Sequence, residues 1–307
     1  SFSAFGPKTQ SNVASPPSFW ACGYEAVLEG MTGFSQEWLK LREEVDHRSR
    51  NREVAQALAA RFALRDHVTV VDLGAGTGSN LRATADLLPA KQDWTLVDKD
   101  TSLLATARTR LKAWAETSSN DGSELLLEKG GRDIRVRFLE ADLTQDLPSL
   151  VSTADLITAS AFFDLTSVEF IRALVKSAAE ARAAFYAALT YNGIQRWQPH
   201  RPLDNQMTAA FHRHQLRDKG FGPAAGPAAS AHLADYLKVS GYAVVEGDSL
   251  WNLGRNDRML IDELVRGHAF AVAETGLVAT KSIEDWVKVQ RTAAMVGHVD
   301  IFAAPTS

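Results

Sequence analysis

An apolar segment that ends in an acid and continues with a glycine at every second position constrains this chain more than any other feature. The segment reads Val68-Thr-Val-Val-Asp-Leu-Gly-Ala-Gly-Thr-Gly-Ser79. Its first half predicts a buried strand. The glycines predict a tight loop, because glycine adopts positive φ and lets a ligand approach the backbone closely. The segment therefore predicts an α/β protein with a ligand-binding loop after an early strand.

The spacing of the glycines separates two kinds of nucleotide site. A dinucleotide-binding loop has the pattern Gly-x-Gly-x-x-Gly, which from Gly74 would require a glycine at position 79. The residue there is Ser79. Asp72, Gly76 and Gly78 instead complete an Asp-x-Gly-x-Gly-x-Gly pattern, which suits a cationic ligand. A dehydrogenase is therefore disfavoured, and only NADH binding would restore that interpretation.

Three further segments follow at the intervals of a doubly wound sheet. Trp94–Asp98 is a short apolar run that ends in an acid, Asp133–Asp142 alternates polar and apolar residues, and Ala154–Ser160 predicts a fourth strand. With the glycine loop, these segments resemble the class I S-adenosylmethionine-dependent methyltransferases. The resemblance implies a doubly wound, seven-stranded, mostly parallel sheet of the Rossmann-like methyltransferase fold. It covers about residues 66–190 with specific motifs and the remainder only by order of elements.

The resemblance implies S-adenosylmethionine as the cofactor and S-adenosylhomocysteine as its product. Asp98 would bind the ribose diol, Asp142 would face the adenine amine, and we expect Arg50 to reach the cofactor carboxylate. The other expected cofactor-binding residues lie within or beside these motifs: Asp72, Gly74, Ala75, Gly76, Gly78, Lys99, Leu143 and Ser160. Two alternatives stay open, since Asp98 could cap the helix that begins near Thr101 and Asp142 could lie in a solvated loop. Asp155 is expected to support the sheet or the glycine loop.

The chain divides into an arm, a cap and one large domain. We expect a flexible N-terminal arm over residues 1–18, an N-terminal helical cap over residues 19–65 and the S-adenosylmethionine-binding domain over residues 66–307. Within this domain, residues 194–231 would form a lid insertion between the fifth strand and its helix. A C-terminal helical insertion over residues 256–295 would interrupt the antiparallel pair of strands that ends the sheet in the resembled family.

Composition narrows the class of partner. The net charge is −4 without a long basic tract, which disfavours nucleic acid as a substrate. Cys22 is the single cysteine, so the chain has no disulfide framework and no cysteine-based zinc site. No apolar run approaches the ~18 residues that span a bilayer, and residues 1–18 lack the apolar core of a signal peptide. We expect a cytoplasmic protein, without bound metal or a membrane partner, that acts alone or as a homodimer.

Substrate-side residues are expected at the carboxyl edge of the sheet, where open α/β sheets bind ligands. The large side chains that could surround a transferred methyl group are Phe162, Phe163, Tyr191, Trp197 and Trp251, and Asn192 is a further substrate-side candidate. The candidates for a general base are Asp164, His200, His212 and His214, of which Asp164, His212 and His214 are preferred. Core packing explains such aromatic residues equally well, and simple exposure explains a lone histidine.

The implied reaction is an in-line displacement, in which an oxygen, nitrogen or carbon nucleophile of a small molecule attacks the sulfonium methyl. The segment Ser160-Ala-Phe-Phe-Asp164 stands where enzymes that methylate adenine or glutamine nitrogen carry Asn-Pro-Pro-Tyr or Asp-Pro-Pro-Tyr, so those acceptors are disfavoured. An aminopropyltransferase on the same fold would need a pair of acids there. A catalytically silent S-adenosylmethionine-binding partner protein is the third alternative, and the intact acids and glycines disfavour it.

Overall fold

The computed structural model describes residues 35–145 and 147–306. Gln36–Ser307 form one structural unit. The predicted arm, Cys22 and residues 19–34 of the predicted cap lie outside the described residues. The described part of the cap consists of helices α2 (Gln36–Ser49) and α3 (Arg52–Phe62). Asn51 separates the two helices, because its side chain accepts the free backbone N–H groups at the start of α3.

The central sheet has ten strands among the described residues, in the order β3-β4-β5-β2-β1-β6-β7-β10-β8, with β9 paired to β10. The strands are β1 (His67–Leu73), β2 (Lys91–Asp98), β3 (Thr117–Asp121), β4 (Glu124–Lys129), β5 (Arg132–Glu140), β6 (Leu156–Ser160), β7 (Ala184–Gln198), β8 (Tyr242–Asp248), β9 (Trp251–Leu253) and β10 (Ala293–Pro305). Strands β5, β2, β1, β6 and β7 are parallel, and β10 is antiparallel to β7 and β8. The doubly wound, mostly parallel sheet is confirmed.

The expected number of seven strands is wrong, because a hairpin of β3 and β4 extends one edge and β9 adds a segment beside β10. All five residues of β3 are exposed, so this strand lacks the apolar alternation that marks a half-buried strand in a sequence. The turn between β3 and β4 contains Gly122 at φ +59°. This Asp-Gly turn is the sequence signal that could have revealed the hairpin.

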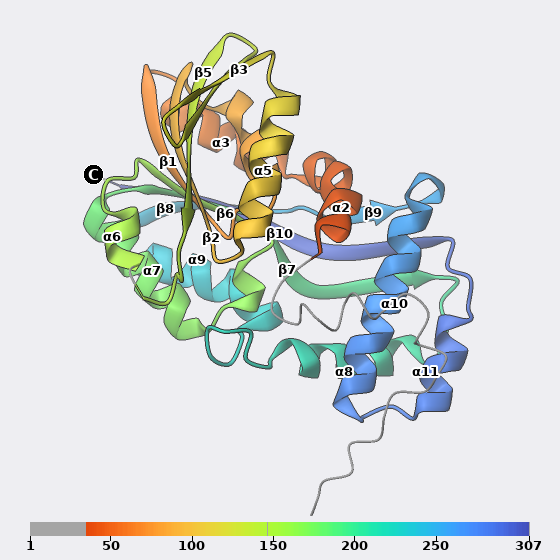
Figure 1. Ribbon diagram of the computed structural model, residues 1–307. Helices are drawn as coiled ribbons and strands as arrows, with labels where there is room; N and C mark the ends of the chain where they lie inside the picture. Colours follow the sequence, from red (N-terminus) through yellow and green to blue (C-terminus); the bar gives the residue numbers. More distant parts are fainter. Residues whose placement is uncertain (1–34, 146, 307) are drawn as a thin grey trace, which may run out of the picture. The chain divides into compact units, whose positions relative to one another are not determined.

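Helices cover both faces of the sheet (Figure 1). They are α4 (Ser79–Thr84), α5 (Thr101–Trp114), α6 (Leu147–Val151), α7 (Val168–Ala181), α8 (Asp204–Gln215), α9 (Ala229–Val239), α10 (Arg258–Thr275) and α11 (Thr280–Val287), with short 3-10 turns η2 (Ala85–Leu87), η3 (Phe163–Leu165), η4 (Gly226–Ala228) and η5 (Arg255–Asp257). A hydrophobic core lies where α7 and α9 pack against the middle of the sheet, with Leu174 and Leu233 fully buried. The sequence places apolar residues of α7 on one side of the helix, and this side is the buried one.

Strands β7 and β10 continue past the ends of the other parallel strands, and α8, α10 and α11 accompany this outer part (Figure 1). We call it the extension. Its core contains Trp197, Trp286 and His268, with ring centroids 5.3 to 5.8 Å apart. Arg291 is fully buried beside these rings and pairs with Asp204 at 2.6 Å. Because a buried cation costs several kcal/mol without its partner, loss of Asp204 would destabilise the extension.

The expected lid and helical insertion fall largely within the extension. Residues 194–231 comprise the end of β7, helix α8, a loop and the start of α9, and α8 packs against α10. Residues 256–295 contain α10 and α11, but β10 already begins at Ala293, so the helical part of this insertion ends before residue 295. The role of residues 194–231 as a lid stays a prediction.

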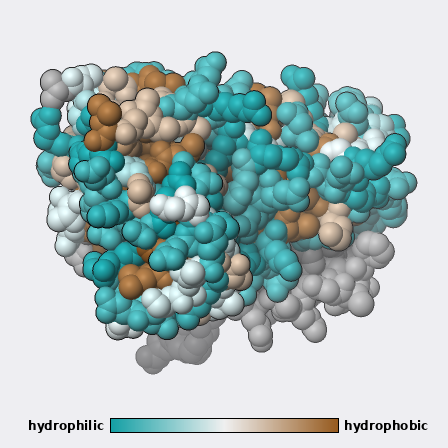
Figure 2. Space-filling model, turned by 90° about the horizontal axis from the view of Figure 1, so that it is seen from above, coloured by the Kyte–Doolittle hydropathy of each residue, from teal (hydrophilic) through white to brown (hydrophobic). Residues whose placement is uncertain are grey.

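No helix in the described ranges is long and apolar enough to cross a bilayer. The face seen in Figure 2 is mainly hydrophilic, and its hydrophobic side chains form separate patches. The most exposed large hydrophobic side chains, Leu64, Val239 and Met259, come from different parts of the chain. Such scattered exposure is ordinary for a protein surface.

Candidate functional site

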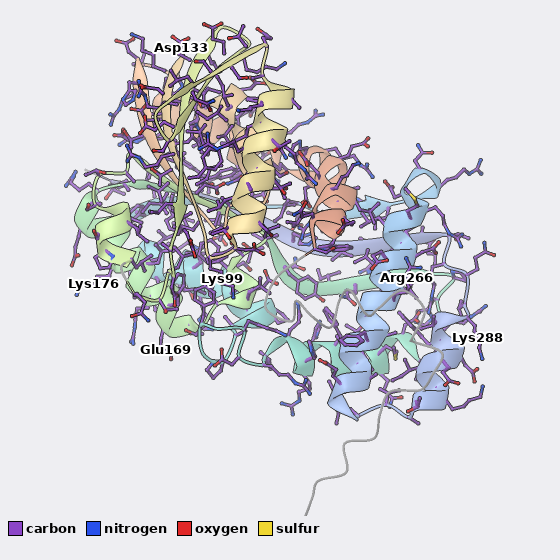
Figure 3. The ribbon with its side chains drawn as sticks, viewed as in Figure 1. Lys99, Asp133, Glu169, Lys176, Arg266 and Lys288 are labelled. Atoms are coloured by element: carbon purple, nitrogen blue, oxygen red, sulfur yellow. The ribbon has the colours of Figure 1, made fainter. Side chains whose placement is uncertain are left out.

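The parallel strands end together at one edge of the sheet. The register of β2 and β5 pairs Lys91 with Asp133 at one end and Asp98 with Glu140 at the other. Figure 3 shows Lys99, directly after β2, far from Asp133 near the start of β5. The glycine loop after β1, the acid after β2 and the segment after β6 therefore meet at this carboxyl edge, where open α/β sheets bind ligands.

The glycine loop has the backbone conformation that its sequence predicts. Gly74, Gly76 and Gly78 have φ angles of +63°, +52° and +73°. A Cβ atom on Gly74 would lie 2.8 Å from Cδ2 of Phe162, and one on Gly76 would lie 3.4 Å from Cδ1 of Leu39 in α2. The loop is thus enclosed between the segment after β6 and the cap helix, and a side chain at Gly74 has no room.

Asp98 connects the end of β2 to the glycine loop. Its Oδ2 accepts a hydrogen bond of 2.8 Å from the backbone N–H of Gly76, and its Oδ1 accepts one of 3.0 Å from the N–H of Asp100. The N-cap of α5 is Asp100, which accepts from the N–H groups of Ser102 and Leu103. Asp98 therefore does not cap this helix, and its carboxylate retains lone pairs for a ligand.

Asp142 is exposed in the loop after β5. Its Oδ1 accepts hydrogen bonds from the backbone N–H and the hydroxyl of Thr144, at 2.9 and 2.7 Å. These bonds, with a smaller contribution from Lys99, lower the pKa of Asp142. The neighbouring Leu143 is buried. Asp142 is consequently a fixed, ionised acceptor at neutral pH, and its contact with adenine stays a prediction.

Asp72 lies buried beneath the glycine loop. Its Oδ1 accepts a hydrogen bond of 2.7 Å from the Asn80 amide, whereas its Oδ2 is buried and has no partner in the described part of the chain. Burial raises the pKa of Asp72 to about 7. Burial of an oxygen without a hydrogen-bond partner destabilises the ionised form of Asp72. A positively charged ligand above the loop would stabilise this ionised form.

Arg50 lies between α2 and α3 and binds protein groups. It donates hydrogen bonds to Asn80 Oδ1 at 2.8 Å and to Thr84 Oγ1 at 3.0 Å, and its Nη1 is 3.4 Å from the hydroxyl of Tyr186. Asn80 thereby links Arg50 to Asp72. The expected contact of Arg50 with a cofactor carboxylate stays a prediction, and the described hydrogen bonds connect the cap to α4.

Helix α2 is attached to the glycine loop by ion pairs. Glu43 pairs with Arg82 at 2.6 Å and with Arg110 at 3.4 Å. The same two arginines donate hydrogen bonds to Thr77 of the loop, Arg82 to the backbone oxygen and Arg110 to the hydroxyl, both at 3.0 Å. No local pattern in the sequence singles out Glu43, because Arg82 and Arg110 lie on different helices far along the chain.

Two of the expected substrate-side aromatic residues belong to hydrophobic cores. Phe163 is fully buried, with its ring 5.7 Å from that of Phe185, and Trp197 lies in the core of the extension. The substrate-side role of these two residues stays a prediction. Phe162, by contrast, touches the glycine loop at Gly74.

A group of rings lies beyond the carboxyl edge, and we call Tyr191, His212, Trp251 and His298 the ring cluster. The hydroxyl of Tyr191 is 2.9 Å from Nε2 of His212. The ring centroid of His298 is 6.2 Å from that of Tyr191 and 5.1 Å from that of Trp251. The guanidinium of Arg42 in α2 lies 4.9 Å from the Trp251 ring. Sequence reasoning missed His298 and Arg42, because only the pairing of β7 with β10 and the docking of α2 bring them here.

Asp164 adjoins this cluster from the segment after β6. Burial raises its pKa to about 6, while Arg42 and the backbone N–H of Tyr191 act in the opposite direction. Of the four base candidates, the structure brings Asp164 and His212 close to Tyr191. His214 instead pairs with Glu274 at 2.7 Å, and His200 is exposed after β7. Asn192 follows Tyr191, and its Oδ1 accepts the backbone N–H of Ile194.

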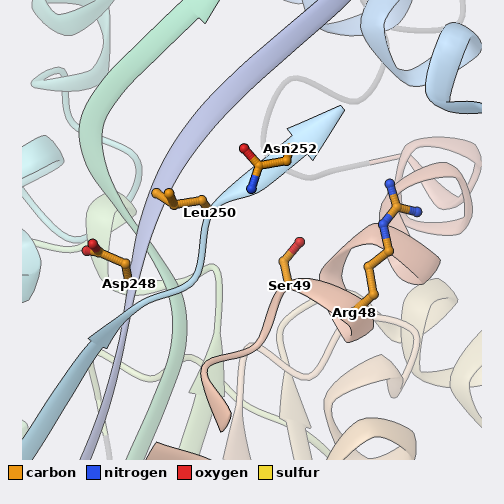
Figure 4. Close-up of a pocket in the computed structure, with 5 residues that line it drawn as sticks. All are labelled: Arg48, Ser49, Asp248, Leu250 and Asn252. Atoms are coloured by element: carbon orange, nitrogen blue, oxygen red, sulfur yellow. The ribbon is translucent and has the colours of Figure 1, made fainter. Parts of the chain in front are cut away.

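Figure 4 shows a pocket of about 390 Å³ elsewhere, lined by Arg48, Ser49, Asp248, Leu250 and Asn252. It lies between the end of α2 and the connection from β8 to β9. None of the expected site residues lines it, and Arg48 is bound to Asp257 at 2.6 Å. Within residues 35–145 and 147–306, no group of three or more His, Cys, Asp or Glu side chains could hold a metal ion.

The fold and the site define a doubly wound α/β protein with an acid-linked glycine loop at the carboxyl edge. No family model and no curated protein matches the sequence. Solved structures with a similar fold include the YcgJ protein of Bacillus subtilis, which is 13% identical, with a TM-score of 0.45 over 84% of this chain and 100% of that one. The cyclopropane synthase MmaA2 of Mycobacterium tuberculosis is 12% identical, with a TM-score of 0.47 over 88% and 94%.

A further similar structure is a SAM-dependent methyltransferase of Geobacter sulfurreducens solved with S-adenosyl-L-homocysteine. It is 14% identical, with a TM-score of 0.41 over 89% of this chain and 100% of that chain. Likenesses this distant do not identify a reaction, since one fold hosts many functions.

Proposed function

We propose that this chain is an S-adenosylmethionine-dependent methyltransferase acting on a small-molecule acceptor. The observation that carries the proposal is the hydrogen bond between Gly76 and Asp98, which holds an ionisable acid against a positive-φ glycine loop at the carboxyl edge. The buried, unpartnered Oδ2 of Asp72 beneath the loop fits a ligand that carries a positive charge. A dinucleotide pyrophosphate would instead bring negative charge toward this carboxylate.

The residues present fit the cofactor. The free lone pairs of Asp98 would accept the ribose hydroxyls, and Asp142 would accept the adenine amine. The loop from Gly74 to Gly78 admits close approach of a ligand to the backbone. Lys99, Ser160 and Ala75 lie at the ends of the strands that border this loop. Arg50 remains in the proposal because it reaches Asn80 from the cap side, at 2.8 Å.

Bound S-adenosylmethionine supplies a methyl group on a positively charged sulfur. The chain's own residues orient the acceptor, exclude water and accept a proton. Phe162 and the ring cluster provide an apolar wall at the carboxyl edge, and Asp164 and His212 lie within reach of Tyr191 as proton acceptors. Holding the two reactants in line is the main contribution that we assign to the protein.

The test is calorimetric titration with S-adenosylmethionine, S-adenosylhomocysteine and NADH. We expect micromolar binding of the two sulfur nucleotides and no binding of NADH. Decarboxylated S-adenosylmethionine with a diamine tests the aminopropyltransferase alternative. Binding without transfer to any acceptor would favour a catalytically silent partner protein, and tight NADH binding would overturn the proposal. Cytoplasmic location and a single chain or homodimer belong to the same proposal, and light scattering measures the latter.

A further inference from the structure

Asp164 contributes a negative charge that its surroundings only partly offset. Its side chain is buried, with 9% exposure for the residue. Arg42 is the cation that acts on it, but the Arg42 guanidinium is bound to Asp46 through hydrogen bonds of 2.8 and 3.1 Å. The charge of one arginine therefore acts on two aspartates. When both are ionised, the three groups carry one net negative charge in a water-poor setting, where charge complementarity counts strongly.

The histidines of the ring cluster do not offset this charge at neutral pH. Burial, with a contribution from Arg42, lowers the pKa of His298 to about 3. Burial also lowers the pKa of His212 below its ordinary value. Both rings are therefore predominantly neutral near pH 7, and they offer lone pairs as well as N–H groups.

The same cluster contains buried hydrogen-bonding atoms without partners in the described part of the chain. Two of these atoms are acceptors: Oε1 of Gln195, and Nδ1 of His298 when the ring proton is on Nε2. The third atom, Nε1 of Trp251, is a donor. Gln195 lies close to Tyr191, since its side chain acts to lower the pKa of that residue. With the carboxylate of Asp164, acceptors outnumber donors. Since buried polar groups normally find partners, this excess favours a ligand rich in N–H donors.

Building on the proposed function, we propose that the methyl acceptor is a primary or secondary amine that binds between Asp164 and the ring cluster. Its ammonium form would pair with the Asp164 carboxylate, and its N–H groups would donate to the unpartnered acceptors. The face of Tyr191 offers a cation–π contact. A carboxylate or phosphate acceptor would instead be repelled by Asp164.

Transfer to a primary amine requires a neutral nitrogen with a free lone pair. Asp164 accepts one proton from the bound ammonium and leaves a neutral amine. The nitrogen lone pair forms the new N–C bond as the C–S bond breaks, and the electron pair of that bond returns to sulfur. The product is a methylated ammonium ion and a neutral thioether, and the proton on Asp164 is then released to solvent. No oxidant or further co-reactant is required.

The test uses matched acceptors on common skeletons with labelled S-adenosylmethionine. The first set is 2-phenylethylamine, 2-phenylethanol and 3-phenylpropanoate, and the second is hexylamine, hexanol and heptanoate. We expect labelled product from the amines, with mass spectrometry placing the methyl on nitrogen. Asp164→Asn should lower kcat/KM for the amine by about 100-fold and leave the Kd for S-adenosylhomocysteine within about threefold. Asp235→Asn, at an exposed acid of α9, is the matched control and should behave as the wild type.

The outcomes separate the two proposals. Failure of S-adenosylmethionine to bind would remove the proposed function itself. Binding of S-adenosylmethionine with methylation of the alcohols or carboxylates, or with no amine accepted, would overturn the amine assignment and leave the cofactor assignment in place. Wild-type amine methylation by Asp164→Asn would overturn the role of Asp164.

Discussion

The backbone N–H of Gly76 donates a hydrogen bond of 2.8 Å to Oδ2 of Asp98, so the acid after the second parallel strand positions the loop after the first. The Asp98 carboxylate therefore positions the glycine loop and also lies at the carboxyl edge, where we propose that the cofactor binds. A substitution at Asp98 should consequently alter both the loop and cofactor binding.

Replacing Asp98 with alanine should weaken binding of S-adenosylmethionine by about 10- to 100-fold. Hydrogen bonds to a charged group contribute about 1.5–3 kcal/mol, and a tenfold change in Kd corresponds to about 1.4 kcal/mol. Calorimetric titration measures the change. The matched control is Asp93→Ala in the same strand, where the carboxylate pairs with His67 at 3.0 Å on the surface. Equal affinities for the two variants would contradict the assignment of Asp98.

Replacing Gly74 with alanine should disrupt the loop more than its backbone angle alone explains. A residue with a Cβ at φ +63° costs about 1–2 kcal/mol, and the new Cβ would also meet Phe162 at 2.8 Å. Gly276→Ala is the matched control, because Gly276 has φ +66° and no atom within 4 Å of the Cβ position. We expect both variants to lose stability in thermal unfolding, and Gly74→Ala alone to lose cofactor binding. Retained binding by Gly74→Ala would show that the loop can move away from Phe162.

The sequence predicted the parts of the site that depend on local patterns. The positive φ angles of the glycine loop follow from glycine itself, and the parallel strands follow from apolar runs that end in acids. Asp155 also has the expected supporting role, since its Oδ2 accepts the backbone N–H of Thr69 in β1 at 2.9 Å. These features require only a strand, a turn and the order of elements along the chain.

Long-range pairing created the parts that the sequence did not predict. His298 faces Tyr191 because β10 returns antiparallel to β7, with a shift in register just before His298. Arg42 reaches Trp251 only after α2 has packed beside β9. Neither contact has a short-range signal, since each joins residues separated by much of the chain. Long-range packing also explains Trp197, which was expected at the carboxyl edge of the sheet and lies in the core of the extension.

The unfolding free energy should fall with rising pH through the titration of Asp72. Its folded pKa of about 7 lies above the ordinary value of 3.8, so the folded state holds a proton that the unfolded state has released between these values. Stability must then decrease as pH rises from about 4 to 7 and stay level above, and Asp72→Asn should remove this decrease. We expect the variant to gain about 2–4 kcal/mol relative to the wild type across this range in urea unfolding. Asp93→Asn serves as the surface control. If the stability of Asp72→Asn relative to the wild type decreased as pH rises, the predicted direction would be wrong.

Glu43 should control how tightly α2 covers the glycine loop. Glu43→Gln removes the charge that pairs with Arg82 and Arg110, and Arg82 is nearly buried, with 6% side-chain exposure. A largely buried arginine without its carboxylate partner costs about 1–3 kcal/mol. This cost disappears when α2 detaches from the loop. We therefore expect faster amide hydrogen exchange over residues 36–49 and weaker binding of S-adenosylmethionine, because Leu39 of α2 lies against Gly76. Glu44→Gln removes the same charge from the neighbouring exposed position and should leave both measurements unchanged. Unchanged exchange in Glu43→Gln would mean that packing alone, without the ion pairs, holds α2 on the loop.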